Sequence, residues 1–147
     1  MAVETTLVLV KPDGVRRGLA GEVVGRLERK GYDLRGARLI RITKTLAREH
    51  YAEHKGKPFF GELVDFITSG PVLALAVRGE DAIGGVRSLM GATHPKDAAP
   101  GTIRGDLATL LSENVVHGSD GTASASTGPD VMKSTSSPKN GLPLCSA

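Results

Sequence analysis

The chain has 147 residues, with 19 lysines and arginines against 16 aspartates and glutamates, and its length fits one domain with its own core. A formal charge of +3 disfavours nucleic acid as a partner, and the lone Cys145 excludes a disulfide within the chain and a cysteine metal cluster. Because the start lacks a signal-peptide pattern and no apolar run reaches roughly 18 residues, we expect a soluble cytoplasmic protein that does not enter a membrane.

The first part of the chain alternates strand and helix patterns. Residues 5–10 form an apolar, β-branched run that ends at Lys11-Pro12-Asp13-Gly14, which predicts a buried strand entering a sharp turn. Residues 20–30 place their apolar side chains on one face and stop at Gly31, as an amphipathic helix does. Apolar and basic residues interleave over 33–42, and this pattern predicts a second strand.

The middle of the chain continues the mixed α and β order. Helical patterns cover residues 45–54 and 59–67, and Ser69-Gly70-Pro71 ends the second of them. Residues 72–77 form a solid apolar run, which predicts a central strand. A further helical pattern runs from about 81 to 90.

Two common kinds of site find little support in these segments. His50 and His54 lie four residues apart on a predicted helix and could face one metal ion, but the HExxH pattern is absent, and an exposed helix face is the favoured interpretation. The chain also lacks the phosphate-loop pattern that ends in Gly-Lys-Ser/Thr, and it lacks GxGxxG. Both common nucleotide-binding folds are therefore disfavoured.

The last third contains a long loop and a change of composition. Residues 91–105 are rich in glycine and proline and include Thr93 and Arg104, and loops of this length more often carry function than packing. Residues 121–147 are dominated by serine, threonine, glycine, proline and alanine and hold too little apolar surface to offset the entropy of ordering. We expect a folded domain over residues 1–120 and a disordered tail over 121–147.

A single histidine is the strongest candidate for chemistry. His117 follows Val115 and Val116 and precedes Gly118, a pattern that predicts a short strand opening onto a tight turn, with the imidazole at the strand end. Imidazole is mostly uncharged near neutral pH, so a ring nitrogen keeps a lone pair that can attack phosphorus without a separate base. The alternative interpretation is a histidine that only hydrogen-bonds its turn.

Three cationic side chains could join this histidine on a polyphosphate. Lys11 lies at a strand end, Arg87 on a helix and Arg104 in the glycine-rich loop. A guanidinium group can bind two phosphate oxygens and does not lose its charge. Taken singly, each of the three is more typical of a solvated surface residue, so their convergence depends on the tertiary fold.

Five blocks of sequence, in order between about Val3 and Asp120, closely resemble nucleoside diphosphate kinase. These blocks are residues 6–14, 50–60, 69–72, 100–106 and 114–120. The resemblance implies an α/β (α+β) fold, a ferredoxin-like sandwich in which helices flank a four-stranded antiparallel sheet. It also implies an enzyme that moves the γ-phosphate of a nucleoside triphosphate onto a histidine and then onto a nucleoside diphosphate. By motif position that histidine is His117.

The same resemblance implies the other residues of the site and the partners. It implies that Arg87, Thr93 and Arg104 contact the phosphates of the nucleotide. It also implies a magnesium ion, held through these phosphates and not directly by the protein. Sugar and phosphate hydrogen bonds fall to Lys11 and Asn114, and the base stacks between Phe59 and Leu111. Supporting positions near the histidine fall to Tyr51 and Ser119. Family members are usually hexamers or tetramers, which implies a homo-oligomer.

The chain departs from the family pattern after the His-Gly-Ser-Asp block. The position at which the family places a glutamate against the histidine ring falls at about Gly128. Loss of such an orienting partner would cost roughly 10- to 100-fold in activity. The departure leaves an alternative function open, a catalytically impaired member that binds nucleotides or proteins, and it leaves open whether Asp120 or Asp130 orients the ring instead.

Overall fold

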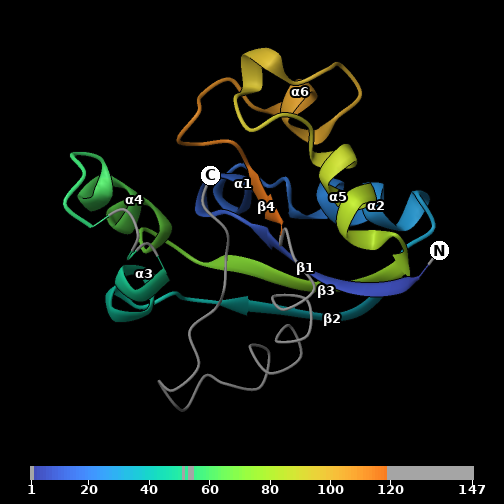
Figure 1. Cartoon of the computed structure of the whole chain (residues 1–147), viewed down its shortest axis with the longest axis horizontal. Coiled ribbons are helices and arrows are strands. Elements are labelled where there is room, and N and C mark those ends of the chain that lie inside the picture. Colours follow the sequence, from blue (N-terminus) through green and yellow to red (C-terminus); the bar gives the residue numbers. More distant parts are fainter. Residues whose placement is uncertain (1, 51, 53–54, 119–147) are drawn as a thin grey trace.

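A four-stranded antiparallel sheet forms the centre of the fold (Figure 1). The computed structural model describes residues 2–50, 52 and 55–118, so the predicted tail over 121–147 lies outside the described residues. The strands are β1 (Val3–Val10), β2 (Asp33–Ile40), β3 (Val72–Glu80) and β4 (Val116–Gly118), in the order β2-β3-β1-β4. Together with the helices on its faces, this sheet confirms the predicted ferredoxin-like sandwich.

The position of each strand follows from its sequence. Residues 6–10 of β1 are all buried, because this strand lies between β3 and β4 and both of its faces are covered. β2 lies at an edge of the sheet, where exposed and partly buried residues alternate, as expected for a strand with one solvated face. The interleaved basic residues of this segment therefore mark an edge strand.

Helices cover the two faces of the sheet. On one face α2 (Ala20–Arg29) and α5 (Ala82–Met90) pack through Val23, Leu27 and Val86 against the inward residues of β1 and β3. On the other face α3 (Lys44–His50) and α4 (Phe60–Ile67) build smaller apolar clusters around Val64 and Leu46. These four helices lie close to the ranges that periodicity predicted.

Two short helices lie where the sequence predicted a sharp turn and a loop. α1 (Pro12–Arg16) begins where a sharp turn was expected, because Pro12 suits the first helical position and leaves no N–H unpaired there. α6 (Ile103–Leu107) begins inside the expected loop, where the hydroxyl oxygen of Thr102 accepts the Gly105 N–H at 3.0 Å. A single turn, η2 (Pro95–Asp97), interrupts the same loop.

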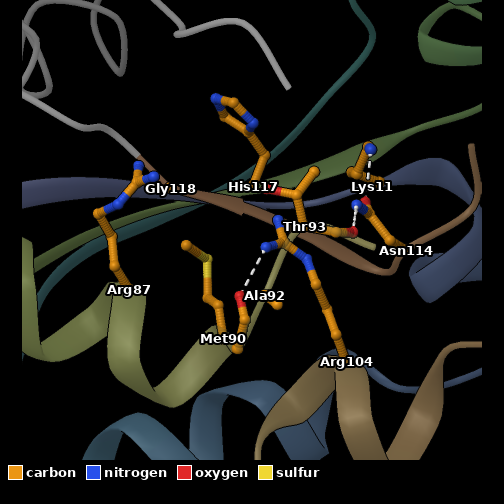
Figure 2. A pocket seen from close by; sticks show the side chains of 10 residues that line it. Lys11, Arg87, Met90, Ala92, Thr93, Arg104, Asn114, His117 and Gly118 are labelled. Atoms are coloured by element: carbon orange, nitrogen blue, oxygen red, sulfur yellow. Dashed lines mark hydrogen bonds between the residues drawn. The ribbon is translucent and has the colours of Figure 1, made fainter. Parts of the chain in front are cut away.

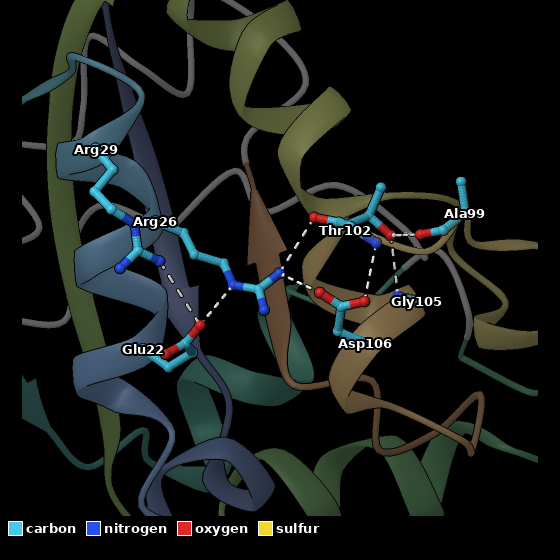
Figure 3. Close-up of polar contacts among 8 residues, drawn as sticks. Glu22, Arg26, Arg29, Ala99, Thr102, Gly105 and Asp106 are labelled. Atoms are coloured by element: carbon cyan, nitrogen blue, oxygen red, sulfur yellow. Dashed lines mark hydrogen bonds and ion pairs between the residues drawn. The ribbon is translucent and has the colours of Figure 1, made fainter.

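Arg26 ties α2 to the end of this loop (Figure 3). Its Nη1 lies 2.8 Å from the Asp106 carboxylate and donates to the Gly101 carbonyl at 3.2 Å, while its Nε donates to Glu22 at 2.8 Å. The Gly101 N–H donates to Asp106 as well, and these contacts hold the pKa of the Asp106 carboxyl below its usual value, the Gly101 bond first and Arg26 second. The network anchors α6, which carries Arg104.

We predict that Arg26→Met lowers the free energy of unfolding by about 1 kcal/mol, because it removes two charge-assisted contacts and a bond to a carbonyl at a partly exposed site. Arg29→Met is the matched control, since Arg29 lies on the same helix, is exposed and reaches Glu22 only at 3.8 Å. Urea denaturation of both variants measures the difference. Equal losses in the two variants would contradict an anchoring role for Arg26.

Candidate active site

β4 presents His117 beside the end of β1. His117 pairs with Leu9 and is the central residue of β4, so the prediction that it ends the strand is wrong, because pairing with β1 extends through Gly118. Gly118 faces α5 so closely that a Cβ there would lie 2.7 Å from Cε of Met90. Since side chains alternate along a strand, His117 projects from the opposite face of the sheet.

A cavity surrounds this histidine and gathers side chains from distant parts of the chain (Figure 2). Five further predicted site residues line it, namely Lys11, Arg87, Thr93, Arg104 and Asn114. In the view of Figure 2 the imidazole rises from β4 with the Arg87 guanidinium to one side and the Lys11 ammonium to the other. The structure therefore brings together the cationic residues that the sequence left scattered.

Arg104 is the most deeply placed of these cations. Its side chain is only 6% exposed, and its Nη1 and Nη2 donate to the carbonyls of Gly91 at 3.0 Å and Val116 at 2.8 Å. Within the described part of the chain its buried Nε has no hydrogen-bond partner. Burial, and then the positive charge of Arg87, lower the pKa of Arg104 to about 10. Two neighbouring guanidinium groups that repel each other make this cavity a favourable place for an anion.

Lys11 begins a chain of polar contacts along one wall of the cavity. Its Nζ donates to Oδ1 of Asn114 at 2.7 Å, and Nδ2 of Asn114 donates to the Thr93 carbonyl at 2.9 Å. The same Nζ lies 5.5 Å from the centre of the Phe66 ring on α4. Burial lowers the pKa of Lys11 to about 8, while Asp13 raises it and Arg104 lowers it further. Lys11 is thus a cation whose charge is sensitive to its surroundings.

The remaining predicted residues lie elsewhere. Phe59 and Leu111 are 43% and 50% exposed and are not among the residues that line the cavity, and the Lys57 ammonium lies 5.7 Å from the Phe59 ring. The predictions on Tyr51 and Ser119 fall outside the described residues.

Residues that sequence reasoning missed support the backbone before His117. Val115 was expected in the strand, but it has φ 73° and precedes the strand, because its N–H donates to the buried carboxylate of Asp13 at 3.1 Å instead of joining the sheet. Met90 and Ala92 also line the cavity. No local pattern marks these positions, since each contact depends on residues far away in the sequence.

The described residues that line the cavity do not resemble the ligand set of a directly bound metal ion. Across residues 2–50, 52 and 55–118 no three side chains of histidine, cysteine, aspartate or glutamate gather in a metal-binding group, and the cavity lining contains no carboxylate. The donors are cationic and amide groups, which suit the oxygens of a phosphate chain. The described lining therefore fits phosphate oxygens better than it fits a directly held divalent cation.

The cavity combines an imidazole with cationic donors that suit phosphate oxygens, which is what a phosphotransferase working through a histidine requires. The model of the family "Nucleoside diphosphate kinase" matches residues 4–132. The chain belongs to the nucleoside diphosphate kinase family, as the resemblance in its sequence predicted.

Individual relatives agree with this assignment. The chain is 63% identical over 123 residues to a nucleoside diphosphate kinase of Rubrobacter xylanophilus, covering 84% of this chain and 92% of that protein. It is 60% identical over 117 residues to the enzyme of Thermus thermophilus, covering 80% and 85% of the two chains.

Solved structures agree as well. The nucleoside diphosphate kinase of Halobacterium salinarum, solved in complex with CDP, superposes with a TM-score of 0.78 at 59% identity, over 81% of this chain and 78% of that one. A family protein of Babesia bovis superposes with a TM-score of 0.81 at 39% identity, over 95% and 97% of the two chains.

Family membership establishes the activity. The protein is a nucleotide-binding transferase that moves the γ-phosphate of a nucleoside triphosphate to a nucleoside diphosphate through a phosphohistidine, in a reaction that requires a divalent cation. The predicted enzyme class is therefore confirmed. No described helix has the length and apolar character needed to span a membrane.

The lowered pKa of Lys11 predicts that nucleotide affinity depends on pH. Its pKa of about 8 lies below the ordinary 10.5, so the folded protein loses this charge as the pH rises through 8. Because phosphates favour the protonated amine, we expect nucleoside diphosphate to bind up to about tenfold more weakly at pH 9 than at pH 7. Isothermal titration calorimetry measures this change. In Lys11→Met the affinity should be lower at pH 7 and constant across this range, and a slope equal to that of the wild type would contradict the assignment to Lys11.

Proposed function

We propose that His117 is the residue that accepts and returns the phosphoryl group. The observation that carries this assignment is the cavity in which His117, Arg87 and the buried Arg104 come together. In the first step a lone pair on an imidazole nitrogen attacks the γ-phosphorus, a phosphorus–nitrogen bond forms and the bond from the γ-phosphorus to the bridging oxygen breaks. The nucleoside diphosphate leaves with that electron pair.

The second step reverses the first with another acceptor. A terminal oxygen of a different nucleoside diphosphate attacks the phosphorus, the phosphorus–nitrogen bond breaks and the electron pair returns to the imidazole. Arg87 and Arg104 stabilise the negative charge on the transferred group and on the bridging oxygen in both directions. Because donor and acceptor phosphates follow the same path, one cavity serves both steps.

Other cavity residues hold the nucleotide. Lys11 and Asn114, joined by a bond of 2.7 Å, are positioned to contact sugar and phosphate oxygens, and Thr93 extends the same wall towards the phosphates. Tyr51 and Ser119 are proposed as supporting residues on motif position alone. The CDP complex of the Halobacterium salinarum relative supports a nucleoside diphosphate as the ligand of this cavity.

The base is proposed to lie between Phe59 and Leu111. Both are large apolar side chains that remain substantially exposed, 43% and 50%, as a surface slot for a planar ring requires. Contact with an aromatic face and an aliphatic side chain does not depend on the hydrogen-bonding edge of the base, so the protein is expected to accept different nucleosides.

We propose Mg²⁺ as the divalent cation. It would be held by the phosphates of the nucleotide, since the described cavity lining supplies amide and cationic groups and no carboxylate. When bound, the ion supplies charge neutralisation at the phosphate chain.

We propose that the protein forms a homo-oligomer, a hexamer or tetramer by resemblance. The edge strand β2 supports self-association, because it has a neighbouring strand on one side only in the described sheet and exposes Leu39 by 61%. We also propose a catalytic domain over residues 1–120 and a separate tail over 121–147, although the family match extends to residue 132. The cytoplasmic location stays a prediction from the sequence.

Incubation with γ-labelled ATP and Mg²⁺ tests the assignment of His117. The wild-type protein should take up label that is stable in base and labile in acid, as a phosphohistidine is, and His117→Ala should take up none. Equal labelling of the two proteins would sink the assignment. Nucleotide binding by a wild-type protein that takes up no label would favour the impaired binding function that the glycine near position 128 suggests.

A further inference from the structure

The backbone just before His117 takes an unfavourable conformation. Val115 has φ 73°, in the left-handed region, and the Val116 N–H donates to the Asn114 carbonyl at 2.8 Å. This bond between residues two apart makes Val115 the centre of a γ-turn with positive φ, which is a strained form. A β-branched residue rarely adopts such a φ, so surrounding contacts must hold it there.

Two contacts from the corner between β1 and α1 hold this turn. Oδ2 of Asp13 accepts the Val115 N–H at 3.1 Å, and the Val115 carbonyl accepts the Lys11 N–H at 2.8 Å. Asp13 and Val115 are 3% and 0% exposed, so water does not compete for these groups. A hydrogen bond to an ionised acceptor is roughly twice as strong as one between neutral groups. The corner therefore pairs both backbone groups of the strained residue.

The corner is shaped for this close approach. A Cβ on Gly14 would lie 2.8 Å from Cγ1 of Val10 and 3.1 Å from the Val115 carbonyl oxygen. Glycine at this position lets the start of α1 reach the turn, which brings the Asp13 carboxylate to the Val115 N–H.

The turn lies among the groups that form the cavity. Asn114 precedes it and contacts Lys11, while the Val116 carbonyl accepts from Arg104 at 2.8 Å and His117 follows directly. A rotation at Val115 to an ordinary extended conformation would therefore displace three groups at once. These are Asn114, the Val116 carbonyl that accepts from Arg104, and His117.

We propose that Asp13 is a positioning residue for phosphoryl transfer. Its carboxylate holds Val115 in the γ-turn and so sets His117 in register with Arg104 and Asn114, although Asp13 is absent from the cavity lining. This inference rests on the proposed role of His117. Asp13 also favours the charged form of Lys11, an electrostatic effect that the experiment must separate from the hydrogen bond.

Pre-steady-state phosphorylation of the full chain by ATP and Mg²⁺, followed by rapid quench, tests the proposal. Asp13→Ala should lower the rate constant for phosphohistidine formation by roughly 10- to 100-fold, because small misplacements of a nucleophile have effects of this size. The KM for nucleotide should also rise, because Asn114 and the charge of Lys11 depend on Asp13, but by a smaller factor than the rate constant falls. Asp13→Asn, which keeps an oxygen acceptor and removes the charge, should recover most of the loss.

Substitution of Val115 separates strain from packing. Val115→Gly and Val115→Ala both remove the buried γ-methyl groups, but only glycine takes a positive φ without steric cost. In the Asp13→Ala background, Val115→Gly should raise the phosphorylation rate about fivefold or more over Val115→Ala. In the otherwise unchanged chain, Val115→Gly should also keep more activity than Val115→Ala, a comparison that does not require the Asp13 variant to fold.

Several results would overturn the proposal. They are a wild-type rate in Asp13→Ala, an Asp13→Asn variant as slow as Asp13→Ala, or a Val115→Ala variant that equals or exceeds Val115→Gly in either background. Absence of label from the wild type, or label retained by His117→Ala, would instead overturn the proposed role of His117, so the two failures are distinguishable.

Discussion

His117→Ala is expected to lower kcat for phosphoryl transfer by on the order of 10⁴-fold or more, equivalent to a barrier about 5.5 kcal/mol higher. Alanine offers no lone pair to the γ-phosphorus, and no other histidine lines the described cavity. The cations that stabilise the transferred phosphate remain, so nucleotide affinity should stay within about threefold of the wild type. A coupled assay of nucleoside triphosphate formation measures the first quantity, and calorimetric titration with nucleoside diphosphate measures the second.

His94→Ala is the matched control for this prediction. His94 lies in the loop before η2, and its Nδ1 accepts the N–H of Lys96, a local contact outside the cavity lining. Its removal should leave kcat within about threefold of the wild type. Substantial turnover by His117→Ala, or a comparable loss in His94→Ala, would contradict the assignment of the nucleophile.

Much of the fold can be predicted from local patterns, because burial leaves a periodic signature. The apolar run over residues 5–10 and the amphipathic stretch over 20–30 both form the elements expected of them. The turn expected at residues 11–14 was wrong, since a single helical turn is too short for periodicity and its start depends on Pro12 and on the approach of Val115. Strand order and topology required the resemblance to a family, because pairing between distant strands has no local signal.

The site was predictable in its chemistry and less so in its geometry. Lys11 and Asn114 are 103 residues apart in sequence yet joined by one hydrogen bond, and neither residue alone suggests the other. Colinear motif blocks brought them together, which is why the cationic residues could be named in advance. The γ-turn at Val115 could not be, because two adjacent valines favour extended backbone, and the contacts that oppose this preference come from the Asp13 carboxylate and the Lys11 N–H, far away in the sequence.

Arg104→Ala is expected to lower kcat by about 10²- to 10³-fold, since removal of one preorganised donor from a site that stabilises developing charge costs roughly 2.7 to 4 kcal/mol. The variant should also lose stability, because the carbonyls of Gly91 and Val116 lose their buried donor. Each carbonyl left unpaired costs about 1 to 3 kcal/mol. Steady-state kinetics with saturating nucleotides and urea denaturation measure the two effects separately.

Arg87→Ala provides the comparison that separates charge from structure. Arg87 lines the same cavity but is exposed on α5, so its removal should lower kcat while leaving the unfolding free energy within about 0.5 kcal/mol of the wild type. Arg104→Lys should keep part of the activity but not both carbonyl contacts, since an ammonium group lacks the planar fork of a guanidinium. If Arg104→Ala retained full turnover, the charge that stabilises the transferred phosphate would have to come from Arg87 and Lys11. The buried guanidinium would then have only a structural role, as a hydrogen-bonded link between the loop and β4.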